Sequence, residues 1–245
     1  MDRFSFACWF KTRANTVAMA YQAPAIAEKP TLCFIPGFRS EFQVSSKSHH
    51  VYNWARRHGC GFITWDHALN GSSVQQWSED GYDILQQFTT KDKLVLVGAS
   101  MGLWIALLLG IRLQPRIQSI IGIGGGLNFT ERWLQEVPAQ YRDDRDYIWK
   151  RPSTYAAEGY YAIPVRFLLD SKAALFAAPK LRVPAPLYLI HGQCDADAPL
   201  SHIQEWVDHR IECPQLTLKV VEDGDHRLSR PQDLALLDSV LNKMV

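Results

Sequence analysis

Lys93–Gly102 reads KLVLVGASMG, in which a β-branched apolar run leads directly into the pattern Gly-x-Ser-x-Gly. A helix-forming stretch, Leu103–Leu113, follows at once. A serine on such a sharp strand-to-helix turn is held in strained backbone geometry, with its hydroxyl raised above the sheet edge and its backbone beside a helix N-terminus. Gly98 and Gly102 suit the turn because strand and helix pack too closely there for side chains. This context predicts that Ser100 is a nucleophile.

Two further strand-like runs downstream end in polar residues. The run Pro186–Ile190 leads to Asp195, and the run Leu216–Val221 leads to His226. Open α/β sheets place their sites at the carboxyl ends of strands, and proteins with this serine turn have the chain order Ser, Asp or Glu, His. A free hydroxyl is a poor nucleophile and needs an adjacent imidazole that a carboxylate orients. We therefore predict Ser100 as nucleophile, His226 as general base and then acid, and Asp195 as the carboxylate.

Each member of this predicted triad also has a simpler structural interpretation. Ser100 could be a turn residue, Asp195 could cap the following helix, and His226 could lie in a surface loop. The order and placement of all three favour the catalytic interpretation. Asp197 remains a competitor for the carboxylate role, whereas Asp225 is directly next to the histidine and therefore poorly placed to reach its ring nitrogen.

An oxyanion hole needs two backbone N–H donors aimed at the developing negative charge. We expect one from Met101, which follows the nucleophile, and the other from the loop after the early strand Thr31–Ile35. That loop opens with Pro-Gly, and Gly37 lets the backbone approach closely. The Phe38 N–H is the expected second donor, with Arg39 as the alternative. The Pro-Gly pair could also be a simple turn.

Length and composition are those of one globular enzyme domain covering residues 1–245. The chain is 47% hydrophobic with a formal net charge of +1, which suits a large single core. No basic run or repeat of aromatic and arginine residues points to a nucleic-acid partner. The most apolar helix, Leu103–Ile111, is too short to span a bilayer and is bounded by Arg112. These observations leave the oligomeric state open.

The five cysteines are scattered and lack C-x-x-C spacing, so neither a disulfide framework nor a zinc site is predicted. This usage favours a reducing compartment. Basic residues near the N-terminus are typical of a transit peptide, but Asp2 and the strand-like run Thr16–Tyr21 argue against one. Ser5–Tyr21 is instead expected to form a β-hairpin. We expect a cytoplasmic protein, or a mitochondrial matrix protein if the source is eukaryotic.

Strand and helix patterns alternate along the rest of the chain, which predicts a mostly parallel sheet with helices on both faces. Asn128–Phe176 breaks the alternation with many large aromatic residues between two sheet strands. We expect a small lid-type insertion there, whose aromatic side chains could enclose a substrate or simply form a satellite core. The other expected elements are helices at Ser48–His58 and Glu79–Phe88, strands at Gly61–Trp65 and Ile117–Ile123, and a last helix that begins near Ser229 with a capping box to Gln232.

Three motifs, the last of which contains the predicted triad histidine, are similar to those of a known family: Asn128–Arg132, Arg151–Ser153 with Tyr155, and Glu222–Pro231. They resemble bacterial serine hydrolases of the α/β-hydrolase superfamily that are related to a mitochondrial palmitoyl-protein thioesterase and acyl-glucuronide esterase. The similarity covers the chain from about Thr31 onward. It implies an α/β-hydrolase fold, hydrolysis of acyl thioesters or oxoesters with no cofactor, and a triad of Ser100, Asp195 and His226.

One segment departs from the family pattern. Relatives usually have an Asp-x-x-Gly-x-Gly-x-Ser loop, whereas this chain has Asp66–Ser73, with Leu69 at a glycine position. The family pattern therefore does not predict the backbone geometry of this loop or the shape of the nearby pocket.

The residues together predict a hydrolase that cleaves small-molecule carboxylic esters or acyl thioesters through an acyl-enzyme on Ser100. A different class stays open, because this fold also serves as a non-catalytic ligand-binding or interaction protein. A hydrolase of C–C bonds or an amidase would use the same triad. The intact triad favours an enzyme, while its substrate is not indicated by the sequence.

Overall fold

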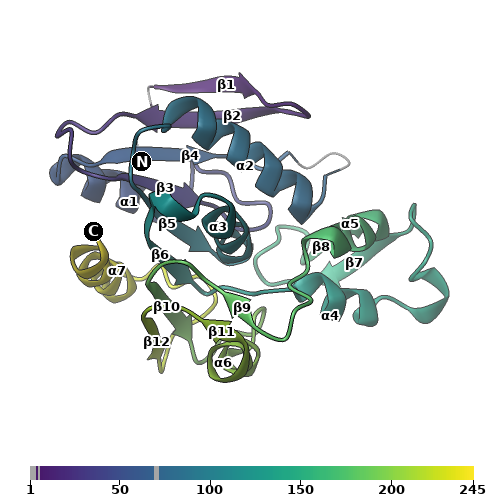
Figure 1. Cartoon of the computed structure of the whole chain (residues 1–245). Coiled ribbons are helices and arrows are strands. Elements are labelled where there is room, and N and C mark those ends of the chain that lie inside the picture. The colour runs from purple at the N-terminus through teal and green to yellow at the C-terminus, as the bar shows by residue number, and fades with distance from the viewer. Residues whose placement is uncertain (1–3, 5, 69–71) are drawn as a thin grey trace.

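A central eight-stranded sheet organises the chain. The computed structural model describes residue 4, residues 6–68 and residues 72–245. The strand order is β1-β2-β4-β3-β5-β6-β10-β12 (Figure 1). The pairs β1–β2 and β2–β4 are antiparallel, and all the other pairs are parallel. The strands are Ala7–Lys11 (β1), Thr16–Gln22 (β2), Thr31–Ile35 (β3), Gly61–Trp65 (β4), Leu94–Ala99 (β5), Ile117–Ile123 (β6), Leu187–Gly192 (β10) and Leu216–Val221 (β12).

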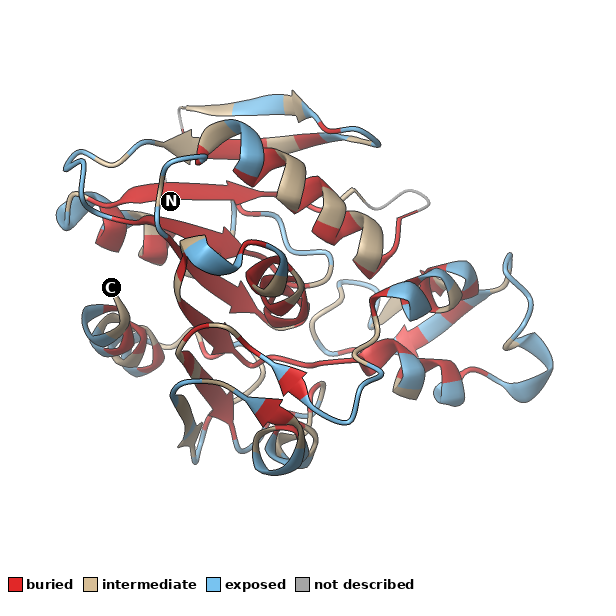
Figure 2. Cartoon of the chain, in the orientation of Figure 1, coloured by how far each residue is buried: buried red, intermediate tan, exposed pale blue. Residues whose placement is uncertain are grey.

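Helices cover both faces of this sheet. Every residue of β3, β4 and β5 is buried, as continuous apolar runs require when both faces are packed (Figure 2). One face packs against α1 and α7, which share a hydrophobic cluster, and the other against α2, α3 and α6. None of the described helices is long and apolar enough to cross a membrane. The helices are Ser46–Arg57 (α1), Val74–Phe88 (α2), Met101–Arg112 (α3), Leu200–Glu205 (α6) and Pro231–Met244 (α7).

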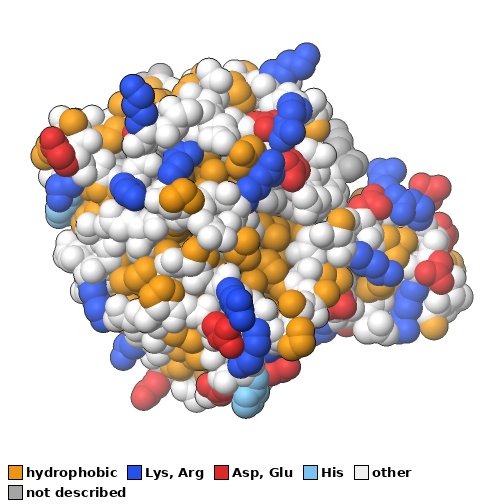
Figure 3. Space-filling model, viewed as in Figure 1, with side chains coloured by type: hydrophobic (Ala, Val, Ile, Leu, Met, Phe, Trp, Pro, Cys, Tyr) orange, Lys and Arg blue, Asp and Glu red, His pale blue; other side chains and the backbone are white. Residues whose placement is uncertain are grey.

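An insertion, residues 128–176, lies between β6 and β10 and projects from the body in Figure 1. It contains an antiparallel pair of strands, β7 and β8, flanked by two helices. In Figure 3, hydrophobic side chains gather where it meets the body, while charged side chains cover its outer end. Its elements are Phe129–Glu136 (α4), Ile148–Pro152 (β7), Tyr160–Pro164 (β8) and Val165–Asp170 (α5); the small strands Leu181–Arg182 (β9) and Ile211–Glu212 (β11) pair outside it.

The predicted mostly parallel sheet, its N-terminal hairpin and the strands at Gly61–Trp65 and Ile117–Ile123 are confirmed. Two helices begin earlier than predicted because serines cap them. The Ser45 hydroxyl accepts a hydrogen bond from the Ser48 N–H at the start of α1, and the Ser73 hydroxyl accepts one from the Gln76 N–H at the start of α2.

The predicted capping box from Ser229 to Gln232 is wrong. The cap of α7 lies one residue later, where the Arg230 N–H donates to Asp233 Oδ2 at 3.0 Å. The Ser229 hydroxyl instead donates to the Arg227 carbonyl at 2.9 Å. The glycine position occupied by Leu69 falls in residues 69–71, outside the described residues.

Candidate active site

Ser100 stands on a sharp turn between β5 and α3. Its φ of 53° is a strained value for a residue with a side chain, and its N–H donates to the Ile123 carbonyl at 2.8 Å. A Cβ on Gly98 would lie 2.4 Å from the Gly102 carbonyl oxygen, and one on Gly102 would lie 2.1 Å from the Ile35 carbonyl oxygen. The predicted need for glycine on both sides of the serine is therefore confirmed.

The structure brings the three predicted triad residues together. His226, in the loop between β12 and α7, places Nε2 2.9 Å from Ser100 Oγ and Nδ1 2.8 Å from Asp195 Oδ2. The Asp195 side chain is fully buried in the loop after β10. Its other oxygen, Oδ1, accepts from the backbone N–H groups of Asp197 and Ala198 at 3.0 and 2.8 Å. The carboxylate is thus held on one side while its second oxygen faces the imidazole.

The two competing carboxylates have other partners. Asp197 Oδ1 accepts from Arg151 Nη1 at 3.0 Å, so this side chain turns toward the insertion. Asp225 Oδ1 accepts from the Leu228 N–H at 3.0 Å. The carboxylate in contact with the imidazole is therefore that of Asp195.

The loop after β3 lies against the serine turn. A Cβ on Gly37 would lie 3.1 Å from Ser100 Cβ and 3.7 Å from its Oγ. Within the described part of the chain, the Phe38 and Met101 N–H groups donate no hydrogen bond. Arg39 has a φ of 54°, and its guanidinium donates to the Ala162 carbonyl. The loop is close enough to supply a donor, while Phe38 and Met101 as oxyanion donors stay a prediction.

His67 holds the loop after β3 through a hydrogen bond. Its Nε2–H donates to the Pro36 carbonyl at 3.0 Å, and its ring lies 5.2 Å from that of Trp77. Burial lowers the pKa of His67 to about 4, which keeps the imidazole neutral. The neighbouring Asp66 accepts from the Phe42 N–H at 2.8 Å, and burial raises its pKa to about 6. No pattern in the sequence indicated this role, although both residues directly follow β4 at the sheet edge where Ser100 follows β5.

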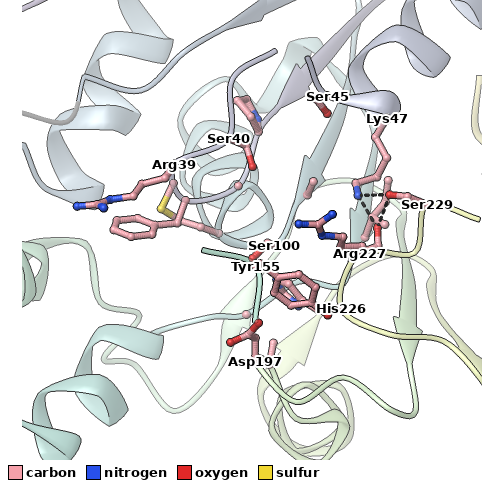
Figure 4. A pocket seen from close by; sticks show the side chains of 18 of the residues that line it. Arg39, Ser40, Ser45, Lys47, Ser100, Tyr155, Asp197, His226, Arg227 and Ser229 are labelled. Atoms are coloured by element: carbon pink, nitrogen blue, oxygen red, sulfur yellow. Dashed lines mark hydrogen bonds between the residues drawn. The ribbon is translucent and has the colours of Figure 1, made fainter. Parts of the chain in front are cut away.

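A cavity of about 590 Å³ opens above Ser100, between the body and the insertion (Figure 4). Aromatic and basic side chains share its wall, so the cavity offers both apolar and charged surface. The Phe, Trp and Tyr residues are Phe34, Phe38, Phe129, Trp133, Tyr155 and Tyr161, and the Lys and Arg residues are Arg39, Lys47, Arg132, Arg151 and Arg227.

The loop that carries His226 is held by the residues after it. Lys47 donates to the Arg227 carbonyl and to the Ser229 hydroxyl, as the dashed lines in Figure 4 show. Burial lowers the pKa of Lys47 to about 8. The Arg227 guanidinium lies 4.7 Å from the centre of the Tyr155 ring, which lies 5.9 Å from that of His226. No pattern in the sequence indicated Lys47.

Across residues 6–68 and 72–245, no group of three or more His, Cys, Asp or Glu side chains is arranged to hold a metal ion.

The fold and this site define a hydrolase of the α/β type. The sequence profile of the alpha/beta hydrolase family matches residues 34–235, and the chain belongs to this family. A mitochondrial palmitoyl-protein thioesterase, ABHD10 of Rattus norvegicus, is 26% identical over 246 residues, which cover 96% of this chain and 82% of the relative. The family resemblance predicted from the sequence is confirmed.

Two solved structures share the fold. The alpha/beta hydrolase domain-containing protein 10 from mouse has a TM-score of 0.86 at 24% identity, with 97% of each chain covered. A protein of Agrobacterium vitis S4 has a TM-score of 0.85 at 25% identity, with 98% of this chain and 97% of that chain covered.

Proposed function

We propose that the protein is a serine hydrolase that cleaves carboxylic esters or acyl thioesters through an acyl-enzyme on Ser100. The observation that carries this proposal is the position of one imidazole. His226 lies 2.9 Å from the Ser100 hydroxyl oxygen and 2.8 Å from the Asp195 carboxylate. A non-catalytic binding protein has no need for a strained serine, a base and an orienting acid in this arrangement.

In the first half of the reaction, Ser100 Oγ attacks the substrate carbonyl carbon. His226 Nε2 takes the hydroxyl proton, and the buried Asp195 carboxylate stabilises the imidazolium through its bond to Nδ1–H. Backbone N–H groups of Phe38 and Met101 donate to the carbonyl oxygen as it becomes negative. The tetrahedral intermediate then collapses, and His226 gives its proton to the departing alcohol or thiol. Ser100 is left as an ester of the acyl group.

The second half repeats these steps with water. Water loses a proton to His226 Nε2 and attacks the acyl carbon, and the oxyanion is held by the same donors. Collapse returns the proton to Ser100 Oγ and releases the carboxylic acid. Each residue ends in its starting state, so the cycle consumes one water for each ester and needs no cofactor.

The pocket and the relatives support the proposed substrate class. Phe38, Phe129, Trp133 and Tyr161 form an aromatic wall that suits the apolar part of an acyl group. The name of the curated relative, a palmitoyl-protein thioesterase, supports a thioester substrate. We infer that residues 1–245 form one domain of the α/β-hydrolase type, in which residues 128–176 cover the acyl group as a lid-type insertion.

Hydrolysis of matched substrates tests this proposal. The purified protein should release acid from an octanoyl thioester and from the corresponding octanoyl oxoester, and it should leave the octanoyl amide essentially intact. Thiol or alcohol release is followed continuously, and the acid is quantified at the end. Binding of these compounds without any hydrolysis would support the ligand-binding class instead. Faster amide cleavage would indicate an amidase.

A further inference from the structure

Two of the motifs that carry the family resemblance lie outside the triad, in the insertion. Arg132 is on α4 and Arg151 is on β7, and the fold brings both to residues 193–199, the loop between β10 and α6 that carries Asp195 and is called the acid loop below. Arg151 Nη1 donates to Asp197 Oδ1 at 3.0 Å, and Arg132 Nη2 donates to the Asp197 carbonyl at 2.9 Å. Asp197 therefore accepts from one guanidinium through its side chain and from a second through its backbone carbonyl.

Asp197 is in turn bonded to the triad. Its N–H donates to Asp195 Oδ1 at 3.0 Å, and the next N–H, that of Ala198, donates to the same oxygen at 2.8 Å. The opposite oxygen of Asp195 accepts from His226 Nδ1–H. A continuous chain of hydrogen bonds therefore runs from Arg151 through Asp197 and Asp195 to the catalytic imidazole.

Arg151 is fixed in its place. It is 8% exposed, and its guanidinium lies 4.6 Å from the centre of the buried Trp133 ring. Its Nε lies 3.5 Å from Glu136 Oε2. A guanidinium held by an aromatic face and two carboxylates has few alternative rotamers, so it can hold Asp197 in one position.

The insertion is also closed at its base. The Asn128 amide donates to the Phe176 carbonyl at 3.2 Å and accepts from the Phe176 N–H at 3.0 Å. Asn128 itself has a φ of 51°, a left-handed conformation that asparagine tolerates better than most residues. Hydrogen bonds therefore join the two ends of the insertion to each other and join the insertion to the acid loop.

We propose that Arg151 is a positioning residue that acts through Asp197 to hold the Asp195 carboxylate against His226, with Arg132 fixing the backbone of the same loop. This inference rests on the proposed function. It makes the insertion a structural support of the triad in addition to a wall of the pocket.

Arg151→Met tests the proposal, because methionine fills the space beside Trp133 without donating to Asp197. We expect kcat to fall about tenfold with KM changed by less than about twofold, since a misplaced catalytic group slows the chemical step. Arg151→Lys should recover part of kcat because it keeps a cation for Asp197. The matched control is Arg145→Met, which removes an exposed ion pair with Asp170 in the same insertion. This control should keep wild-type kcat and KM.

A double-mutant cycle separates positioning from a general structural effect. If Arg151 acts through Asp195, then Arg151→Met should cause almost no further loss in an Asp195→Asn background. An equal tenfold loss in both backgrounds would overturn the proposal. A raised KM with unchanged kcat would also overturn it, because Arg151 would then be a substrate contact. If Arg151→Met does not fold, Asp197→Ala breaks the same link from the other side and takes its place in the cycle.

One readout does not depend on turnover. The Nδ1–H proton of His226 should give a strongly deshielded NMR resonance, assigned by its absence in His226→Ala. Arg151→Met should shift or broaden this resonance, whereas Arg145→Met should leave it unchanged. If the wild-type protein hydrolyses no ester, the proposed function fails while this measurement still decides the positioning role. An unchanged resonance in Arg151→Met would contradict that role.

Discussion

The Nε2 atom of His226 lies 2.9 Å from the Oγ atom of Ser100, although 126 positions separate the two residues in the chain. The parallel strands β5, β6, β10 and β12 produce this contact, because adjacent parallel strands end at the same sheet edge. The serine follows β5 at that edge, and the histidine follows β12. A nucleophile and its general base would need this contact, so each partner can be tested separately.

Replacing the nucleophile should remove nearly all hydrolysis. We expect Ser100→Ala to lower kcat by about 10⁶-fold, the scale seen when a triad loses its serine. The fold should be preserved, because the half-buried hydroxyl contributes little packing. Initial rates on an octanoyl ester measure the effect, and circular dichroism checks the fold. A variant that kept more than about a tenth of the wild-type rate would exclude Ser100 as the nucleophile, since that loss is only about 1.4 kcal/mol.

The two neighbouring aspartates should differ strongly. Asp195→Asn should lower kcat by about 10⁴-fold, because an amide stabilises the wrong imidazole tautomer. Asp197→Asn should lower it by less than about tenfold, because an asparagine oxygen can still accept from Arg151 and the backbone N–H still donates to Asp195. Steady-state rates of the two variants on one ester decide the ranking. The reverse ranking would assign the carboxylate role to Asp197.

The aromatic wall of the pocket should favour longer acyl groups. Each buried methylene contributes about 0.8 kcal/mol, so four extra carbons amount to about 3 kcal/mol, or around a hundredfold in kcat/KM if all of it is expressed in the transition state. Acyl esters from C2 to C12, kept below their aggregation limit, measure the trend. A flat profile or a preference for acetyl would mean that the insertion packs only on itself.

His67 should make stability depend on pH. Its pKa is about 4 in the folded chain and ordinarily 6.5, so the unfolded chain binds this proton first as pH falls. The stabilisation is therefore complete above pH 6.5 and is lost as pH falls toward 4, by about 3 kcal/mol in total. Urea unfolding of the wild type and of His67→Gln, a variant that does not titrate but can still donate to Pro36, measures this difference.

Asp66 changes the stability in the opposite direction as pH falls, so the comparison with His67→Gln has to remove its contribution. Its pKa is raised to about 6, so the folded chain holds this proton more tightly and gains stability as pH falls from 6 toward 4. Because both proteins contain Asp66, its contribution cancels in the wild-type minus variant difference. Parallel stability curves for the two proteins between pH 6.5 and 4 would contradict a buried neutral His67.

Much of the fold and the positions of Ser100, Asp195 and His226 could be predicted because they depend on short sequence patterns. A continuous apolar run such as β5 has to be covered on both faces, and Gly-x-Ser-x-Gly after it fits only a close strand-to-helix turn. The placement of Asp195 and His226 after β10 and β12 followed from the same rule for strand ends.

The parts that escaped prediction depend on tertiary contacts. Spacing did not separate Asp195 from Asp197, because the two differ only in tertiary contacts: the Asp197 carboxylate accepts from Arg151, which is distant in sequence. His67 could not be assigned because its partner is a backbone carbonyl, that of Pro36, which leaves no mark in the sequence. The cap of α7 was misplaced by one residue because Ser229 is occupied by Lys47 and the Arg227 carbonyl.

Covalent labelling shows directly whether Ser100 is an activated nucleophile. The protein is incubated with a fluorophosphonate, digested, and analysed by mass spectrometry to locate the adduct. We expect one phosphonyl group, on Ser100, formed far more slowly in His226→Ala and absent in Ser100→Ala. An adduct on another residue, or an unmodified Ser100 after prolonged incubation of the folded wild type, would contradict the assignment of Ser100 as an activated nucleophile.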